Sequence, residues 1–516
     1  MNRLIVCLAV AGLLIAPAVM KAQTGTATIS GAITDPTGAA IADATVRVRN
    51  VNTGIERVVK TNQQGLYVVD RLLPGEYEII VEKPGFKRFA RREVVLQIDQ
   101  RARHDIALEI GAVQEVIEVT AGAAQFLKPE SSELSQVIEE DTVEELPLNG
   151  RNTFELIALN SGVGTTTNSF FKGIGIDLSL NGQRPSTNNF LIGGMDNIEF
   201  ISNAPNNTVQ PDAVAEFNVL TNNFSAEYGR AVGGVVNLQM RSGTNEFHGT
   251  LFEFLRNDVL DATDFFTNKA GEKKNPFRFN QFGGTLGGPI VKNRTFFFAG
   301  YQGTWIVTSN TALLSVPPLA WRSGDFSSLL ADGIQIYDPT TVVGTIGIFP
   351  IRAAFPGNII PAASQNPVGR AILDLYPAPN RPGTFQNYVT PLGSETKTSD
   401  IDVKVDHKFT DNHFIAGRMN LTDFKLEQDS FFGDIGGGGS FPKQLTDNLN
   451  LGLTYTSILS PSVLNEFRFG YLRRKNDVIS SGFGQNLNEQ LGIPGLNVSE
   501  ETSGLAWICP IGFDCL

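Results

Sequence analysis

The most constraining feature of this sequence is a set of segments in its last third in which apolar and polar residues alternate one by one. In Asn448–Thr456, leucines and a tyrosine fall on one face, and asparagine, glycine and threonine fall on the other. Ile401–Asp406 and Asn465–Tyr471 repeat the pattern. Such alternation predicts β-strands with one apolar and one polar face. It suits a soluble sandwich, or a membrane barrel with lipid outside and water inside.

Composition narrows the choice of class. The chain has 516 residues and a formal net charge of −12, and its length allows roughly three or four domains. The acidic balance argues against a nucleic-acid partner, which would require clustered Lys and Arg. The 52 glycines and 35 phenylalanines are typical of strands, turns and aromatic belts. Beyond the N-terminus no run reaches the roughly 18 apolar residues of a membrane helix, so a membrane location has to depend on a barrel.

The first 22 residues predict a secretory signal peptide. Arg3 supplies the positive start, Leu4–Ile15 the apolar core, and Ala16–Ala18 or the position after Ala22 the small-residue exit. A single anchoring helix is the alternative, but the apolar core is short for it. We therefore expect export.

Residues 23–110 contain short alternating runs separated by turn residues, which predicts a small β-sandwich. The runs are Ala44–Arg49, Leu66–Val69, Tyr77–Val81 and Val94–Ile98. The lone His104 has no partners at zinc-ligand spacing. His407 and His413 flank a predicted tight turn and are interpreted as turn residues. The sequence therefore predicts no metal site. Cys509 and Cys515 either pair in an oxidising compartment or stay free.

A glycine-rich turn and a short apolar strand occupy residues 226–237, between the sandwich and the long strands. Gly233 and Gly234 have no Cβ, so another backbone can approach closely there. Phe247–Arg256 then begins the first aromatic-banded strand.

Residues 216–256, EFNVLTNNFSAEYGRAVGGVVNLQMRSGTNEFHGTLFEFLR, resemble the end of the plug and the first barrel strand of TonB-dependent outer-membrane receptors. The resemblance extends to the Oar-like subgroup, which carries an N-terminal carboxypeptidase-regulatory-like domain. GAITDPTGAAIADATVRV and TNQQGLYVVDRLLPGEYEIIVEKPGF resemble that transthyretin-like domain, which is grouped with carbohydrate-binding-like folds. A sugar-binding role and a structural or docking role both stay open for it.

The resemblance implies a mainly β protein. It would consist of a signal peptide, a small transthyretin-like β-sandwich, a mixed α/β plug domain and the first strands of an incomplete antiparallel transmembrane β-barrel. The expected boundaries are 1–22 for the signal peptide, 23–110 for the sandwich, 111–134 for a linker, 135–242 for the plug and 243–516 for the partial barrel, with a long Pro-rich loop at 306–396. A loop of this length is usually functional, and we expect it to face outward and to gate or capture a ligand.

The linker contains a segment that resembles a TonB box, the peptide that such a receptor offers to the periplasmic energy-coupling protein. Its residues are Glu115, Val116, Ile117, Glu118, Val119, Thr120 and Ala121. An extended, β-branched segment with flexible flanks can add as a strand to the sheet edge of a partner. The alternative interpretation is the last strand of the sandwich.

Four segments resemble plug motifs in their usual order: LPLNGRN, NGQR, GGMDN and PDAVAEF, the last as a helix start. Gly193 stands where relatives often carry Asp. Arg151, Arg184, Glu227 and Arg230 are candidates for ion pairs between plug and barrel wall; the alternative is surface charges worth under about 1 kcal/mol each. The motif residues singled out are Asn149, Gly150, Arg151, Asn181, Gly182, Arg184, Asp196, Glu227, Tyr228, Gly229, Arg230, Gly233, Gly234 and Asn237.

The alternation pattern gives roughly seven strands after Ser242, whereas receptors of this kind close with about 22. Unpaired strand edges are costly in lipid. We therefore interpret the chain as the product of a truncated or split gene.

The function implied by the resemblance is active uptake of a nutrient ligand across the outer membrane, energised through a periplasmic TonB-type protein, with an oligosaccharide as one candidate ligand. No nucleophile elbow, zinc spacing, phosphate loop or EF-hand is present in the sequence, so neither an enzyme nor a cofactor is expected. The alternative is a surface adhesion or envelope-structural protein that uses the sandwich and the loops for carbohydrate binding.

Overall fold

The computed structural model describes residues 26–111, 116–120, 133–146, 148, 150–165, 178–200, 203–225, 228–263, 265–269, 271, 273–433, 441–460 and 463–516. The signal peptide predicted for residues 1–22 lies outside these ranges. Within them, no helix has the length and apolar character needed to cross a membrane.

The first domain is a sandwich of two sheets. One sheet has the order β4 (Leu66–Leu72), β1 (Ala27–Thr34), β7 (Arg101–Arg103), with β8 (Ile106–Ala107) also on β1; the other has the order β3 (Glu56–Lys60), β2 (Thr45–Asn50), β5 (Gly75–Glu82), β6 (Arg88–Leu96), β9 (Val116–Thr120). Alternate residues of these strands point inward, and Ile29, Val46 and Ile79 are fully buried between the sheets.

The plug is built around a five-stranded sheet. Its order is β10 (Leu134–Glu139), β15 (Val214–Asn222), β16 (Val235–Met240), β13 (Asn189–Ile192), β14 (Met195–Asp196). Around it lie α2 (Glu140–Glu145), η2 (Thr153–Leu159), the β11–β12 pair (Val163–Thr165, Leu178–Leu180), η3 (Pro185–Thr187) and η4 (Pro211–Ala213). The predicted helix start at PDAVAEF is wrong beyond one turn: η4 ends at Ala213, and the β-branched Val214 begins a strand that is buried along most of its length.

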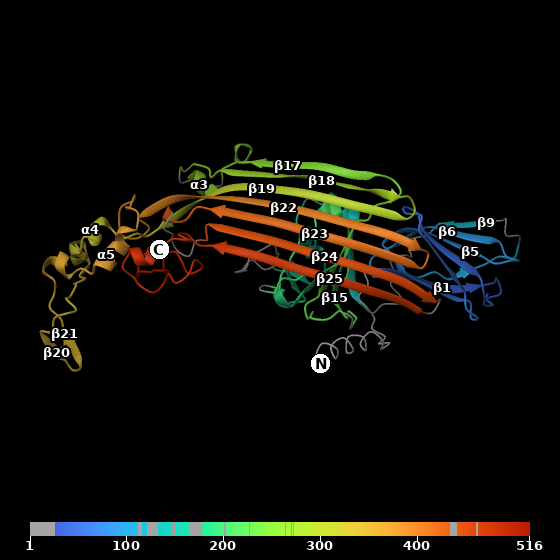
Figure 1. Ribbon diagram of the computed structural model, residues 1–516, viewed down its shortest axis with the longest axis horizontal. Coiled ribbons are helices and arrows are strands. Elements are labelled where there is room, and N and C mark those ends of the chain that lie inside the picture. Colours follow the sequence, from blue (N-terminus) through green and yellow to red (C-terminus); the bar gives the residue numbers. More distant parts are fainter. Residues whose placement is uncertain are drawn as a thin grey trace, which may run out of the picture.

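Seven long antiparallel strands form the third unit, in agreement with the number expected from alternation. In sheet order, which is also chain order, they are β17 (His248–Asn257), β18 (Phe277–Val291), β19 (Thr295–Leu314), β22 (Tyr388–Thr410), β23 (His413–Gln428), β24 (Lys443–Ser460) and β25 (Val463–Ile479). In the described part of the chain the sheet is not closed, and β17 and β25 are its edges. Figure 1 shows it as a long curved wall with the plug against one face.

The two ends of this wall differ in the length of their connections. At the end beside the sandwich, β18 is followed by β19 after residues 292–294, and β22 by β23 after residues 411–412. The opposite end carries long excursions, and the largest, residues 315–387, projects beyond the sheet in Figure 1. We call these ends the short-turn end and the long-loop end. β19 and β22 extend into both ends of the loop predicted at 306–396, because their pairing continues to Leu314 and Tyr388.

The long-loop end has its own short elements and a small core. The elements are η5 (Asp258–Leu260), α3 (Phe265–Lys269), α4 (Leu319–Arg322), η6 (Ser327–Asp332), β20 (Gly344–Ile346), β21 (Phe349–Ile351), η7 (Pro356–Asn358), η8 (Ala362–Ser364), α5 (Pro367–Asp374) and α6 (Leu487–Gln490). Cys509 and Cys515 are joined by a disulfide. Leu516 packs with Val316 and Tyr376, so the last described residues lie against the long loop.

On β24 and β25 burial is the reverse of that in a soluble protein. On β24 the polar Asn448 and Asn450 are 2% and 1% exposed, whereas Leu453 on the opposite face is 37% exposed. On β25 the outward Phe467 and Phe469 are 56% and 53% exposed. Leucine and phenylalanine are normally the buried residues. The leucines of β24 therefore do not form a water-soluble core, and the apolar face suits lipid.

Candidate functional site

The plug rests on a polar area of the wall formed by three neighbouring strands. Its residues are Asp400, Asp402 and Lys404 on β22, Arg418, Asn420 and Thr422 on β23, and Thr446, Asn448 and Asn450 on β24, and each is less than a tenth exposed. Within this area Asn420 donates to Asp402 at 2.6 Å and Thr422 donates to Asp400 at 2.7 Å. These wall side chains are thus hydrogen-bonded to one another, independently of their contacts with the plug, as buried polar groups require. We call these nine residues the plug seat.

The plug meets this seat mainly through asparagines and backbone groups. Asn448 donates to the Asn206 carbonyl at 2.7 Å, and Asn450 donates to the Asn197 side chain at 3.1 Å. Lys404 Nζ donates to the Met240 carbonyl at 3.1 Å. These bonds are directional and individually modest, at about 1 kcal/mol net each. A body held in this way can be displaced stepwise, which a continuous apolar interface would resist.

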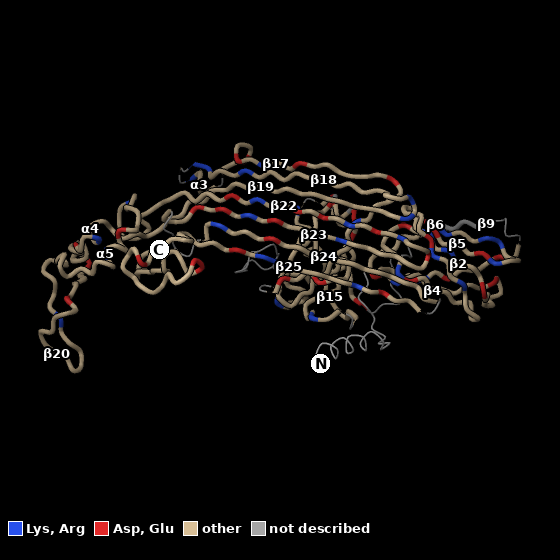
Figure 2. The backbone as a smooth tube through the Cα atoms, in the orientation of Figure 1, with Lys and Arg blue, Asp and Glu red and all other residues tan. Residues whose placement is uncertain are grey.

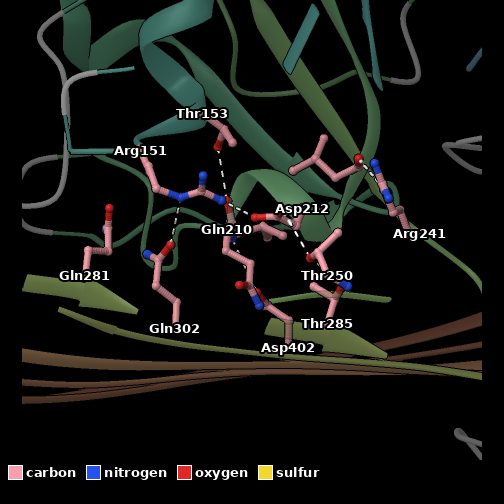
Figure 3. A network of polar contacts seen from close by, with 12 residues as sticks. Arg151, Thr153, Gln210, Asp212, Arg241, Thr250, Gln281, Thr285, Gln302 and Asp402 are labelled. Atoms are coloured by element: carbon pink, nitrogen blue, oxygen red, sulfur yellow. Dashed lines mark hydrogen bonds and ion pairs between the residues drawn. The ribbon is translucent and has the colours of Figure 1, made fainter. Parts of the chain in front are cut away.

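Arg151 is the central residue of a second contact between plug and wall (Figure 3). It forms an ion pair with Asp212 of η4 and donates from Nε to Gln302 of β19 at 3.4 Å. Its guanidinium also lies over the rings of Phe252 and Phe254 on β17, at 4.3 Å and 4.9 Å from their centroids. Cation–π contacts of this kind suit arginine.

The ion pairs observed for these arginines are not the predicted pairs between plug and wall. The carboxylate partner of Arg151 belongs to the plug itself, and Arg230 also pairs within the plug, with Asp196 at 3.4 Å. Arg184 is exposed. Glu227, like Asn149, lies outside the described residues. The wall partners shown for Arg151 are an amide and two aromatic rings, in keeping with the cost of desolvating two charges.

Figure 2 shows basic and acidic residues interspersed along the wall strands and the sandwich.

The predicted motif residues form the turns and the close packing of the plug. Gly150 and Gly182 have positive φ values of 81° and 73°, as left-handed turn positions favour glycine. A Cβ on Gly234 would lie 2.8 Å from the Leu220 carbonyl, so β15 and β16 could not approach as they do. Tyr228 is 6% exposed and packs beside them. A Cβ on Gly229, in contrast, would meet nothing within 4 Å.

Asn237 connects three parts of the molecule. It is fully buried on β16, accepts a hydrogen bond from Gly194 N at 3.0 Å and donates to Asp99 of the sandwich at 3.2 Å. The Gly193–Gly194 turn leads into Asp196 and Asn197, which receive Asn450 of the seat. A continuous series of contacts therefore runs from the sandwich through the plug to the wall.

The sandwich reaches the plug through residues 97–99, which directly follow β6 and which we call the docking loop. Gln97 donates to Glu139 of β10 at 2.5 Å, and the backbone N–H of Ile98 donates to Glu216 of β15. Desolvation raises the pKa of Asp99 to about 7, although its hydrogen bond from Asn237 acts in the other direction.

The predicted coupling segment is the edge strand of the sandwich. Val116–Thr120 forms β9, which pairs in parallel with β6 from Arg88 to Arg92. Glu115 and Ala121, at its two ends, lie outside the described residues. This confirms the alternative interpretation, the last strand of the sandwich, whereas the coupling role of the segment stays a prediction.

No group of three or more potential metal ligands occurs among the described residues. His104 is buried, its Nδ1 lies 2.8 Å from Arg91, and desolvation lowers its pKa to about 4. A cavity of about 580 Å³ lies between sandwich, plug and wall at the short-turn end; it is lined among others by Arg71, Met195 and Arg418.

The plug seat and the docking loop were not predicted from the sequence. The alternation in Ile401–Asp406 identified a strand, but its polar face was assigned to water and not to the plug. The only available signal was a cluster of acids, asparagines and threonines at inward positions of three successive strands. Residues 97–99 carry no motif, and their role depends on which surface of the sandwich meets the plug.

Three family models match the chain. A model described as an outer membrane beta barrel domain matches residues 239–512, more than half of the chain. A TonB-dependent receptor plug domain matches residues 128–235, and a carboxypeptidase regulatory-like domain matches residues 28–109.

Among curated proteins, the TonB-dependent transporter Oar of Myxococcus xanthus is 27% identical over 287 residues, which make up 53% of this chain and 26% of that protein. Among solved structures, a ferric enterobactin receptor of Pseudomonas aeruginosa aligns with a TM-score of 0.37 at 15% identity, over 66% of this chain and 40% of the other. The outer membrane transporter YddB of Escherichia coli aligns with a TM-score of 0.32 at 13% identity, over 66% and 48%. The chain therefore spans about a quarter of the length of the curated relative and less than half of these two structures.

Proposed function

The chain belongs to the TonB-dependent outer-membrane receptors, and on that premise we propose that it serves the active uptake of a nutrient ligand into the periplasm. The ligand binds among the long loops, the plug rearranges in its seat, and the ligand passes along the wall. A periplasmic TonB-type protein supplies the energy by pulling on Val116–Thr120. An oligosaccharide is the candidate ligand class, and the process requires no bond chemistry.

The observation that carries this proposal is the polar character of the plug seat. Asn448, Asn450 and Lys404 hold the plug by four hydrogen bonds. The acceptors are backbone carbonyl or side-chain amide oxygens of the plug. Each such bond can be replaced by one to water when the plug moves, so its net cost is small. This is the kind of interface that a transporter needs, because its plug must stay seated at rest and yet be displaced during each cycle.

The ends of the wall support the proposed direction of transport. Membrane barrels of this class have short periplasmic turns and longer extracellular loops. On that rule the sandwich and β9 face the periplasm, where a coupling protein is available, and residues 315–387 face the exterior, where the ligand arrives.

The test removes the coupling segment. We expect deletion of residues 115–121 to abolish binding of the purified periplasmic domain of a TonB-type protein, measured by isothermal titration calorimetry on the full chain in detergent. A matched control deletes residues 344–350 in the exposed β20–β21 hairpin at the opposite end and should leave binding unchanged. Equal binding by both deletion variants would favour a surface adhesion or structural protein without coupled transport.

A further inference from the structure

The sandwich binds the wall as well as the plug, through an ion pair at the short-turn end. Arg71 Nη1 of β4 lies 2.6 Å from Glu466 of β25, and Glu466 also pairs with Arg468 at 2.7 Å. The side chain of Glu466 is only 2% exposed. A buried carboxylate that pairs with two arginines is a specific contact, because removing Glu466 would leave both cations without this partner.

A β-bulge directs Arg71 toward this contact. Ala27 pairs with Leu72 and Ile29 pairs with Val69, so two residues of β4 face the single Thr28 of β1. Arg71, one of the two, has a φ of 59°. Bulges re-aim side chains at the edges of sheets, and non-glycine residues rarely adopt a positive φ. The backbone thus takes an uncommon conformation at the residue that reaches the wall.

Three further contacts join the sandwich to the turns and strand starts of the wall. The guanidinium of Arg57 lies 4.0 Å from the ring centroid of Phe414, and its Nη1 donates to the Asp411 carbonyl at 3.2 Å. Asn245, just before β17, donates its side-chain amide to the Thr53 carbonyl at 2.8 Å. The contacts span the wall from before its first strand to its last described strand.

On its other side the same domain holds the plug through the docking loop, by the bonds from Gln97 to Glu139, from Ile98 N to Glu216 and from Asn237 to Asp99. A rigid body that is bonded to both a movable part and a fixed part opposes their relative motion. We propose that the sandwich retains the plug: it fastens the plug strands β10, β15 and β16 to the wall, and it must leave the wall before the plug can rearrange.

The position of β9 gives this retention a means of release. β9 pairs in parallel with β6, and β6 continues directly into the docking loop. Tension on β9 therefore acts first on the domain that holds the plug. This step depends on the proposed coupling function, whereas retention itself does not. Departure of the sandwich would also open the cavity of about 580 Å³ that it closes together with plug and wall.

The test compares a release variant with a matched control in the full chain. The release variant combines two substitutions. Arg71→Glu places a carboxylate against buried Glu466, and Asp99→Ala removes the hydrogen bond that the Asn237 amide donates. The control is Arg47→Ala, because Arg47 pairs with Glu56 and Glu82 inside the sandwich. We expect hydrogen exchange of β16 to become about tenfold faster or more in the release variant and to stay within about twofold in the control, from the dependence of exchange on local opening.

A second variant distinguishes loss of retention from misfolding. Arg71→Cys with Glu466→Cys should exchange faster at β16 than the native chain, and a short bis-maleimide bridge between the two cysteines should restore native exchange. Unchanged exchange at β16 in the release variant, or no effect of the bridge, would overturn the retention role. Binding of the TonB-type periplasmic domain, measured on the same samples, should be unaffected; its absence in the native chain would refute coupling and leave the exchange result standing.

Discussion

Asn237 of the plug and Asp99 of the sandwich are joined by a hydrogen bond of 3.2 Å from side-chain amide to carboxylate. The oxygen of the same Asn237 amide accepts a hydrogen bond from Gly194 N, in the plug turn that leads to the residues contacting the seat. Asp99 has a left-handed backbone with a φ of 58°. Its position couples the protonation of one carboxyl to the attachment of the sandwich.

This coupling predicts a pH dependence. Burial raises the pKa of Asp99 from 3.8 to about 7, and the nearby Glu133 acts in the same direction. Because the folded state holds the proton more tightly, the stabilising contribution is fully present below the unfolded pKa and is lost as pH rises through about 7. The protection factor of β16, which is the intrinsic amide exchange rate at each pH divided by the observed rate, should therefore fall between pH 5 and pH 8.5. In Asp99→Asn the side chain stays neutral and this fall in protection should disappear; a fall equal to that of the native chain would contradict the assignment.

The plug seat predicts a local effect of single asparagines. Asn450→Ala leaves the Asn197 side chain and the Asp196 carbonyl without this partner, and we expect a loss of about 1–2 kcal/mol in the local opening free energy of residues 194–207. Hydrogen exchange in those residues measures it. Leu453→Ala on the outer face of the same strand is the control, and it should leave the exchange rate of the plug as it is.

The close packing of β15 and β16 predicts a contrast between two glycines. A Cβ on Gly234 would lie 2.4 Å from Leu180 Cδ2 and 2.8 Å from the Leu220 carbonyl, whereas a Cβ on Gly229 would meet nothing within 4 Å. Gly234→Ala should destabilise the plug by about 1–3 kcal/mol, seen as a lower Tm in differential scanning fluorimetry. Gly229→Ala should shift the Tm little, and similar shifts in both variants would show that the contact does not limit packing.

The outward leucines of β24 predict a dependence on depth in the membrane. Leu451→Arg places a cation on the apolar face in the middle of the strand and should cost about 2–4 kcal/mol of folding into lipid vesicles. Leu445→Arg, on the same outer face near the long-loop end of β24, should cost about 0–1 kcal/mol. The fraction of chain that becomes protease-resistant in vesicles reports both. Equal fractions would indicate that this face does not meet lipid.

Much of the architecture could be predicted from local patterns. Alternation in Asn448–Thr456 and Asn465–Tyr471 identified both the strands and their outward faces, because residues of one strand share a face whatever lies around them. The order of domains followed from the resemblance of successive motifs. The burial of Asn448 and Asn450 beneath the plug could not be deduced in the same way, since a polar inward residue can face either water or protein.

The contacts between the sandwich and the wall could not be predicted from the sequence, for a different reason. Arg71 and Glu466 are far apart in the chain. Arg71 lies in a segment assigned to the sandwich and Glu466 on a predicted strand, and nothing in either pattern indicates that the two meet. The bulge that directs Arg71 arises from a register shift between β1 and β4, which depends on how two distant segments pair. The ion pairs proposed for Arg151 and Arg230 had the right residues but the wrong partners, because a carboxylate within the plug was nearer than any on the wall.

The β20–β21 hairpin has an accessible tip, with Ile348 and Phe349 89% and 70% exposed. It stands at the far end of the longest excursion, away from every residue that seats the plug. Because the hairpin lies far from the plug seat, substitutions at its tip should alter the outermost surface of the long-loop end and leave the contacts that hold the plug unchanged.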